Sequence, residues 1–184
     1  MKSSVALIGF MGVGKTVVGQ ILGAKLGKIL VELDALIEKM AGKSIPEIFR
    51  HDGEIAFREL EIEAVKQVAG KRDVVIACGG GVVLNRINID RLRQEAMIVL
   101  LTASPSVIMK RTTQDREGRP VLWGTKSLSD IQAILKFRKP YYERAADIKV
   151  NTSKLEPEAV AEQIIARLKE YEGINKQKCN KGKG

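Results

Sequence analysis

Short runs of consecutive apolar residues alternate along the chain with longer stretches in which apolar residues recur at helical spacing. The runs predict strands at Val5–Gly9, Ile29–Glu32, Val74–Cys78, Met97–Thr102 and Ile148–Val150. Each run is apolar throughout, which is typical of a parallel sheet covered by helices on both faces. The pattern therefore predicts an α/β fold in which a five-stranded parallel sheet is flanked by helices.

The helical stretches begin and end at residues that favour helix termini. Helices are predicted at Lys15–Leu26, Asp34–Ala41, Pro46–Ala69 with an interruption near Asp52 and Gly53, Ser127–Arg144, and Pro157–Tyr171. A glycine follows each of the first two helices, as is common at helix C-termini. Ser44 and Glu47 have the spacing of a capping box, which predicts a helix start between them.

Two segments do not follow this alternation. Residues 112–126 are polar and charged and include Gly118, Pro120 and Gly124, so they predict a long surface loop. Loops of that length inside compact domains are usually functional or disordered, and we expect a mobile lid here. Residues 173–184 are rich in lysine, asparagine and glycine, which predicts a disordered basic tail after a single domain over residues 1–172.

The composition is that of one globular domain. The chain has 184 residues, of which 45% are hydrophobic and 29% charged, enough for one core. Its longest apolar runs are far shorter than a bilayer-spanning helix, so we expect no membrane segment and no signal peptide. Cys78 and Cys179 are too few for a disulfide framework or a metal cluster, which favours the reducing cytoplasm.

The net charge of +9 raises the question of nucleic-acid binding. Four of the lysines, at positions 176, 178, 181 and 183, lie in the predicted tail, where no acidic residue balances them. No basic helix, aromatic ladder or zinc spacing accompanies the charge, so we expect no nucleic-acid partner. A modest positive excess on the domain also suits an enzyme whose substrates are anions.

A phosphate-binding motif follows the first predicted strand and opens the first helix. The segment Gly9-Phe10-Met11-Gly12-Val13-Gly14-Lys15-Thr16 fits G-x-x-x-x-G-K-[ST] in the context that this motif requires. Backbone N–H groups would surround phosphate oxygens, Lys15 would reach the β and γ phosphates, and Thr16 would bind Mg²⁺. The predicted ATP contacts in the motif are Gly12, Val13, Gly14, Lys15, Thr16 and Val17.

The phosphoryl acceptor has to be predicted from residues elsewhere in the chain. Glu32 and Asp34 end the second strand, at the sheet edge where open α/β folds bind ligands, although Asp34 could instead cap the following helix. The third strand ends in Gly79, Gly80 and Gly81, which would bring bare backbone and N–H donors close to a ligand.

Two arginines are candidates for binding an anionic acceptor. Helical projection places Arg58 on the same arc as Ile55, Ile62 and Val65, and an inward-facing arginine needs an anionic partner. That partner could be a substrate or a buried carboxylate of the protein itself. Arg138 lies two residues before Pro140 in a predicted helix, and alone it is a weaker signal because solvated arginines on helices are common.

Taken together, these motifs resemble the shikimate kinase family from Val5 to about Leu168. The resemblance rests on the Gly-Lys-Thr loop, Glu32 and Asp34, the run from Ser44 to Phe49, Asp52-Gly53-Glu54, Phe57-Arg58, the three glycines, Arg119-Pro120, and Arg138 with Pro140 and Tyr142. The family usually has Asp-x-Asp where this chain has Glu32-Leu33-Asp34. The resemblance implies a P-loop fold of the nucleoside-monophosphate-kinase type and a monomer.

The resemblance also implies a reaction, namely transfer of the γ-phosphoryl of ATP to the 3-hydroxyl of shikimate in aromatic amino-acid biosynthesis. By resemblance, residues 34–69 and the glycine turn would bind shikimate and Asp34 would contact its reacting hydroxyl. The implied substrate contacts are Asp34, Phe49, Phe57, Arg58, Gly79, Gly80, Gly81 and Arg138. The catalytic residues would be Lys15, Asp34 and Arg119, with Arg119 closing over the γ-phosphate.

Further residues are implied at the nucleotide and the metal. Arg111 and the loop Asn151–Pro157, with Pro157 as a contact, would hold the adenine. One Mg²⁺ would be bound by Thr16 and, through a water, by Glu32, unless Glu32 faces solvent. Two other functions stay open, a related kinase of another small acid such as gluconate and a nucleotide-dependent binding module. Trp123 lies in the predicted lid and would report its closure, or would be a fixed anchor under a static loop.

Overall fold

The computed structural model describes residues 2–112 and 127–181, with side chains up to Tyr171. Its five strands are β1 (Ser4–Ile8), β2 (Ile29–Glu32), β3 (Val74–Ala77), β4 (Ala96–Thr102) and β5 (Ile148–Asn151). They form one parallel sheet in the order β2-β3-β1-β4-β5. The predicted five-stranded parallel sheet is thus confirmed. The expected lid, including Arg119 and Trp123, lies outside the described residues except for Thr112 at its start.

The strand order explains where a ligand can bind. β1 lies in the centre, with β3 on one side and β4 on the other, and all five of its residues are buried. After β1 the chain crosses to β2 at one end of the sheet, and after β3 it crosses back over β1 to β4. A crevice opens at the carboxyl ends of the strands where the order reverses in this way. The loops after β1, β2 and β3 therefore meet at one edge.

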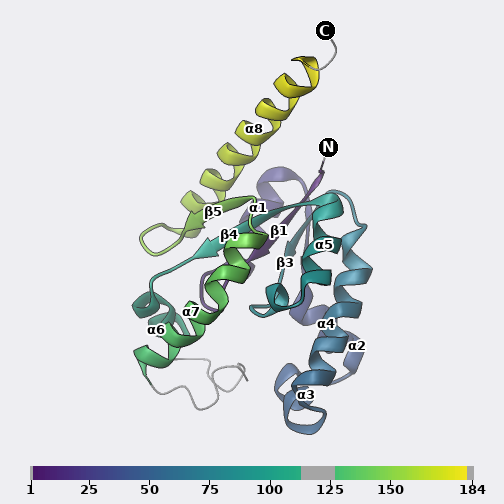
Figure 1. Cartoon of the computed structure of the whole chain (residues 1–184), viewed down its shortest axis with the longest axis vertical. Coiled ribbons are helices and arrows are strands. Elements are labelled where there is room, and N and C mark those ends of the chain that lie inside the picture. Colours follow the sequence, from purple (N-terminus) through teal and green to yellow (C-terminus); the bar gives the residue numbers. More distant parts are fainter. Residues whose placement is uncertain (1, 113–126, 182–184) are drawn as a thin grey trace.

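Helices cover both faces of the sheet (Figure 1). They are α1 (Lys15–Leu26), α2 (Leu33–Ala41), α3 (Ile45–His51), α4 (Gly53–Ala69), α5 (Arg86–Glu95), α6 (Pro105–Thr112), α7 (Leu128–Ala145) and α8 (Pro157–Lys181), with a short 3-10 turn η1 (Val82–Leu84). Alternate strand residues supply two cores. Val5 and Leu7 pack with α1 and α8, whereas Ala6 and Ile8 pack with α4 and α5.

The predicted helix ends are found close to where the sequence signals them. Gly27 and Gly42 follow α1 and α2 in left-handed conformations, each with φ 64°. Glu47 accepts hydrogen bonds from the Ser44 backbone N–H at 2.8 Å and from its hydroxyl at 2.6 Å, as a capping box at the start of α3 requires. The interruption before α4 lies at Gly53, where φ is 83°.

Three elements differ from the sequence-based expectation. α5 was not predicted because its residues are mostly polar, and α6 was not predicted because it is only eight residues long; the start signals of Asn85 and Pro105 stand alone. The Asn85 side chain accepts a bond from the Ile87 N–H at 3.1 Å and caps α5. α8 continues to Lys181, where the sequence predicts a disordered tail from residue 173. Apart from Gly173, the residues 169–181 include no strong helix breaker, so the helix can propagate.

Candidate active site

The loop between β1 and α1 is built around the ammonium group of Lys15. Gly12 and Gly14 have φ of 76° and 95°, which side chains with a Cβ rarely adopt. At Gly12 a Cβ would also come within 2.8 Å of the Thr112 methyl group. The Lys15 ammonium donates to the carbonyls of Gly9 at 2.8 Å and Phe10 at 3.0 Å. The loop therefore holds a cation at the start of α1, where the helix dipole also favours an anion.

Arg111 joins the phosphate loop to the loop after β5. Its guanidinium donates to the Gly12 carbonyl at 3.3 Å and to the Thr152 carbonyl at 3.1 Å. The Thr152 hydroxyl in turn donates to the Val13 carbonyl at 3.0 Å. The end of α6, the phosphate loop and the start of the Asn151–Pro157 loop are thus fixed to one another, as a nucleotide-binding wall would need.

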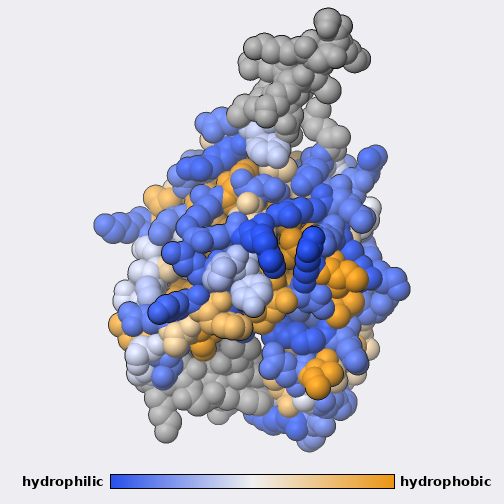
Figure 2. Space-filling view, in the orientation of Figure 1, coloured by the Kyte–Doolittle hydropathy of each residue, from blue (hydrophilic) through white to orange (hydrophobic). Residues whose placement is uncertain are grey.

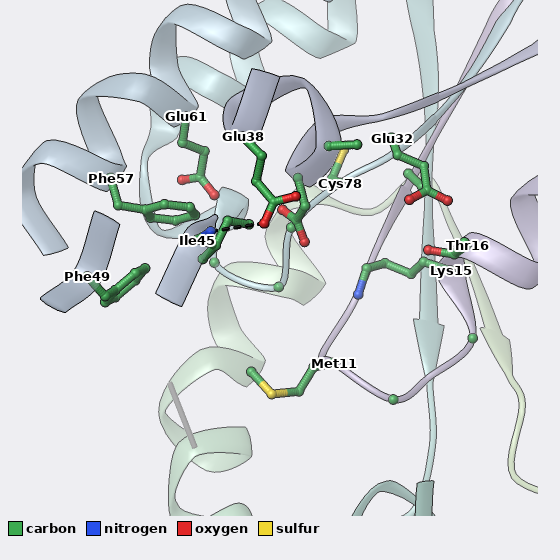
Figure 3. A pocket seen from close by; sticks show the side chains of 18 of the residues that line it. Met11, Lys15, Thr16, Glu32, Glu38, Ile45, Phe49, Phe57, Glu61 and Cys78 are labelled. Atoms are coloured by element: carbon green, nitrogen blue, oxygen red, sulfur yellow. Dashed lines mark hydrogen bonds between the residues drawn. The ribbon is translucent and has the colours of Figure 1, made fainter. Parts of the chain in front are cut away.

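A cavity of about 560 Å³ lies beside the phosphate loop at the carboxyl ends of β1, β2 and β3. Its lining includes most of the predicted site residues, namely Gly12, Gly14, Lys15, Thr16, Val17, Glu32, Asp34, Phe49, Phe57, Arg58, Gly79, Gly80, Gly81, Arg111 and Arg138. Figure 3 shows side chains from several elements pointing into it. Val13 is buried away from the cavity, Pro157 starts α8 outside its lining, and Arg119 lies outside the described residues.

Asp34 lies inside the first turn of α2 and does not cap it, because the N-cap position is occupied by Glu32. The alternative that Asp34 is a helix cap is therefore wrong. Asp34 can be reached from the cavity, yet protein surrounds most of it, and this desolvation raises the pKa of its carboxyl group. The nearby charge of Lys15 opposes that rise in pKa. The Asp34 carboxylate is thus exposed to the cavity and is a hydrogen-bond acceptor close to the phosphate loop.

The Arg58 side chain is held by two carboxylates of its own helix. It lies 3.1 Å from the Glu61 carboxylate and 2.9 Å from that of Glu54. Burial alone would lower the pKa of Arg58, but the two carboxylates outweigh it and raise the pKa. The sequence left open whether the partner of Arg58 belongs to the protein, and in this structure it does. Arg58 still lines the cavity.

Glu61 is one of seven cavity residues that sequence reasoning missed, the others being Met11, Ala35, Glu38, Ile45, Ala77 and Cys78. Its side chain is 1% exposed, and burial raises the pKa of its carboxyl group while Arg58 lowers it. The available signal was spacing, because residues three apart on a helix lie on the same face, and Glu61 follows Arg58 at that distance. A buried carboxylate beside an arginine fixes the guanidinium at the cavity wall.

The three glycines after β3 bring bare backbone against the charged side chains of the site. A Cβ on Gly79 would lie 2.6 Å from the Asp34 carboxylate and 3.4 Å from that of Glu61. A Cβ on Gly81 would overlap the Arg58 guanidinium. The Gly80 carbonyl, by contrast, accepts hydrogen bonds from α7. The sequence explained the glycines by close approach to a ligand, and the structure adds close approach to Asp34, Glu61 and Arg58.

Arg138 has an unsatisfied hydrogen-bond donor at the cavity. Its side chain is 5% exposed, and its Nη1 donates to the Gly80 carbonyl at 3.2 Å. Tyr142, one turn later on α7, donates to the same carbonyl at 2.5 Å, and burial raises the pKa of Tyr142 to about 12. The buried Nε of Arg138 has no hydrogen-bond partner among the described residues. An unpaired buried donor is costly, and here it belongs to a guanidinium that lines the cavity, where an anion could bind.

The oxygen donors beside the phosphate loop suit magnesium. Figure 3 shows the side chains of Glu32 and Thr16 close to Lys15 at one end of the cavity. Within residues 2–112 and 127–171 no group of three or more His, Cys, Asp or Glu side chains gathers as a metal site. Mg²⁺ in kinases is commonly held by one or two carboxylates together with substrate phosphates, so a hydroxyl and a carboxylate fit its requirements.

No helix in the described part of the chain could cross a membrane.

Comparisons with known proteins agree on one family. The family model described as shikimate kinase matches residues 11–169. A shikimate kinase of Thermodesulfovibrio yellowstonii is 44% identical over 175 residues, which cover 95% of this chain and 98% of the relative. The solved shikimate kinase of Acinetobacter baumannii in complex with shikimate superposes with a TM-score of 0.88 at 30% identity, covering 92% of this chain and 94% of that one. A gluconokinase of Sinorhizobium meliloti, with a TM-score of 0.58 at 20% identity and coverage of 96% and 97%, shares the fold.

Proposed function

Because the chain belongs to the shikimate kinase family, we propose that it transfers the γ-phosphoryl group of ATP to the 3-hydroxyl of shikimate, giving shikimate 3-phosphate and ADP. The observation that carries this proposal is that Arg58 and Arg138 line the same cavity as Lys15 of the phosphate loop. The two arginines that would bind a carboxylate and the lysine that would bind a phosphate thus lie around the same cavity. The product would serve aromatic amino-acid biosynthesis. The requirement of the enzyme for ATP and the free thiol of Cys78 are consistent with a cytoplasmic location.

The nucleotide half of the site would bind ATP with Mg²⁺. Gly12, Gly14 and the N–H groups at the start of α1 would surround the phosphates, and Lys15 would exchange its two carbonyl contacts for phosphate oxygens. Thr16 would bind Mg²⁺ directly and Glu32 would bind it through a water. When bound, the metal ion neutralises charge on the β and γ phosphates. Arg111 would contact the adenine from the wall that it shares with Thr152.

The acceptor half would bind shikimate by its carboxylate. Arg138 offers a buried guanidinium with an unpaired Nε donor, and Arg58 adds a second guanidinium that Glu61 keeps in place. Two arginines suit a carboxylate because each planar fork can donate two parallel hydrogen bonds. Phe49 and Phe57, whose ring centroids are 4.8 Å apart, would form an apolar wall beside the ring. The glycine turn would contribute backbone to the ring hydroxyls.

Asp34 would orient the reacting hydroxyl and accept its proton late in the transfer. Phosphoryl transfer needs mainly positioning and charge neutralisation, so a strong base is unnecessary. Lys15 opposes the raised pKa of Asp34, which favours the ionised carboxylate needed to accept the proton. As the hydroxyl oxygen bonds to the γ phosphorus, the bond from that phosphorus to ADP breaks. The charge that develops on the phosphoryl oxygens would be stabilised by Lys15 and the bound metal ion.

A rival acceptor is a linear sugar acid such as gluconate. The gluconokinase likeness shows the fold alone. The aromatic wall of Phe49 and Phe57 favours a cyclic acid, because the face of a ring can lie against it whereas a chain of hydroxyls would lose hydration there. The alternative function, a nucleotide-dependent binding module, does not explain why Arg138 has a buried donor without a partner.

The proposal is tested by measuring ADP release with ATP, Mg²⁺ and, in separate reactions, shikimate, gluconate or no acceptor. We expect release that depends on shikimate and exceeds the other two rates by at least about 100-fold. The variant Arg138→Lys keeps the charge but loses the planar fork, so it should lose shikimate-dependent activity while binding ADP nearly as tightly as the wild type. Equal rates with gluconate, or release without any acceptor, would overturn the assignment of shikimate.

A further inference from the structure

A second hollow, separate from the candidate active site, lies between α7 and the outer strands β4 and β5. Its volume is about 370 Å³, and it shares no lining residue with the active-site cavity. Apolar side chains form its floor, including Phe10, Val13, Leu100 and Ile108, and Leu135 of α7 forms part of one wall. We call this hollow the α7–β5 groove. Volume and lining are in the range of small-molecule sites.

In the described part of the chain, the helix that packs mainly against β5 is α8. β5 alternates, so that Ile148 and Val150 are buried whereas Lys149 and Asn151 are exposed and face the groove. α7 packs against α6, η1 and β4. The hollow therefore opens at the edge of the sheet beside the half-buried Leu135, above floor residues that are themselves only 0–2% exposed. Figure 2 shows hydrophobic residues scattered among hydrophilic ones on the face of the molecule seen in Figure 1.

The rim of the groove is positively charged. Lys136 and Lys139 of α7 and Lys149 of β5 line it, together with one acid, Glu143. Glu143 is shared, because its carboxylate lies 3.6 Å from the Lys149 ammonium and 3.9 Å from that of Lys139. Three cations against one anion leave a net charge of +2 above an apolar floor. This combination is complementary to a molecule that has an apolar body and an anionic head group.

We propose that the α7–β5 groove binds a small amphiphilic anion, whose acyl or aryl body lies on the apolar floor and whose carboxylate meets the lysine rim. The floor supplies burial of apolar area, and the lysines supply charge-assisted hydrogen bonds at the exposed end. A folded protein partner is disfavoured by the small volume, because a stable interface between proteins needs a far larger area than this groove offers.

An occupant of the groove would contact residues that also position the active site. Phe10 forms part of the floor, and the Arg138 guanidinium carbon lies 5.7 Å from the centre of its ring on the other side. Tyr142 lines the groove and donates its hydroxyl hydrogen bond to the Gly80 carbonyl. A ligand that shifts either ring would shift Arg138 or Gly80. The expected consequence, which rests on the proposed function, is a change in shikimate affinity that is larger than the change in ATP affinity.

Binding is tested without turnover, by titration calorimetry and amide NMR of the full chain with octanoate and with 3-phenylpropionate as separate probes. The matching neutral amides, octanamide and 3-phenylpropionamide, measure the contribution of charge. We expect one or both acids to bind more tightly than their amides and to shift the amide signals of Lys149 and Asn151. Preference for octanoate would identify an acyl ligand, and preference for 3-phenylpropionate an aryl ligand.

The double variant Lys136→Met/Lys149→Met keeps the aliphatic stems and removes two rim charges, so it should weaken acid binding about fivefold or more. The matched control Lys66→Met/Lys169→Met changes two exposed lysines on α4 and α8 and should bind as the wild type does. Equal binding to both double variants, or no signal shift at β5 with either acid, would overturn the site. Unchanged shikimate KM at saturating acid would overturn the coupling alone, and loss of kinase activity in the wild type would bear on the proposed function instead.

Discussion

The guanidinium of Arg58 lies 3.1 Å from the carboxylate of Glu61, one turn further along α4, and the Glu61 side chain is 1% exposed. A second carboxylate, Glu54, lies 2.9 Å from the same guanidinium but is 60% exposed. Glu61 thus fixes Arg58 at the cavity wall from the buried side. The orientation of Arg58, the arginine that we propose binds the substrate carboxylate, depends here on a residue that need not touch the substrate.

Replacing Glu61 should separate acceptor binding from nucleotide binding. In Glu61→Gln, Arg58 loses its buried anionic partner, so we expect the shikimate KM to rise at least about tenfold while the ATP KM changes little. The free energy of unfolding should not fall, because burial raises the pKa of Glu61 on balance and its ionised carboxylate therefore costs stability at neutral pH. Steady-state kinetics and urea unfolding check both effects. Glu54→Gln is the matched control and should leave both quantities near wild type; equal effects of the two changes would contradict the positioning role of Glu61.

A methyl group on Gly79 should impair catalysis more than folding. Its Cβ would lie 2.6 Å from the Asp34 carboxylate, which can move because it is the end of a side chain. In Gly79→Ala we therefore expect kcat to fall by roughly 10²-fold through misplacement of Asp34, with little loss of thermal stability. Gly70→Ala is the control, since nothing lies within 4 Å of a Cβ there and its φ is −87°. If Gly79→Ala keeps normal kcat, Asp34 has no positional role.

The ionised carboxylate of Asp34 should lower the stability of the folded protein at neutral pH, although the proposed reaction needs it. Because burial raises its pKa above the ordinary value of 3.8, the folded state keeps its proton to higher pH than the unfolded chain does. Stability then falls as pH rises between the two pKa values, and the ionised carboxylate destabilises the fold at neutral pH. Asp34→Asn should raise Tm at pH 7.5, by less at pH 5, and reduce kcat by about 10²–10⁴-fold. Calorimetric scans of Asp34→Asn and the wild type at both pH values measure the change in Tm. A Tm of Asp34→Asn below that of the wild type at pH 7.5 would contradict the predicted stabilisation.

Glu32 tests the departure from the family pattern of Asp-x-Asp. If it binds Mg²⁺ through a water, the extra methylene is tolerated, because a rotamer change can restore a contact to the hydration shell. Glu32→Asp should therefore remain active. Glu32→Gln should raise the Mg²⁺ concentration needed for half-maximal rate and for Mg²⁺-dependent ADP binding, with shikimate affinity nearly unchanged. The same Mg²⁺ dependence in Glu32→Gln and wild type would exclude Glu32 from the metal site.

Much of the fold could be predicted because its signals are local. The apolar runs of the strands, Gly27 and Gly42 after α1 and α2, and the capping box of Ser44 and Glu47 each leave a pattern within a few residues. The phosphate loop could be placed because Lys15 and its glycines belong to one short motif. α5 was missed because Ile89 and Leu92 are the only apolar residues of its buried face and most of its other residues are polar or charged.

The site residues that sequence reasoning missed or left open depend on contacts between distant elements. Spacing along α4 places Glu61 beside Arg58, but Glu61 becomes a site residue because α4 packs beside the glycine turn after β3, which no local pattern reports. The unpaired Nε of Arg138 follows from the packing of α7 on Gly80 and Phe10. The α7–β5 groove likewise depends on how α7 packs against the sheet, which the sequence does not show.

The most direct test of the central claim is to identify the product. The purified chain is incubated with Mg²⁺, ATP and an equimolar mixture of shikimate and gluconate, and both acids are then analysed by mass spectrometry and phosphorus NMR. Shikimate should gain one phosphoryl group on its 3-hydroxyl, in an amount equal to the ADP formed, while gluconate stays unmodified. Phosphorylated gluconate, a phosphoryl group on another shikimate hydroxyl, or ADP formed with both acids unmodified would contradict this claim.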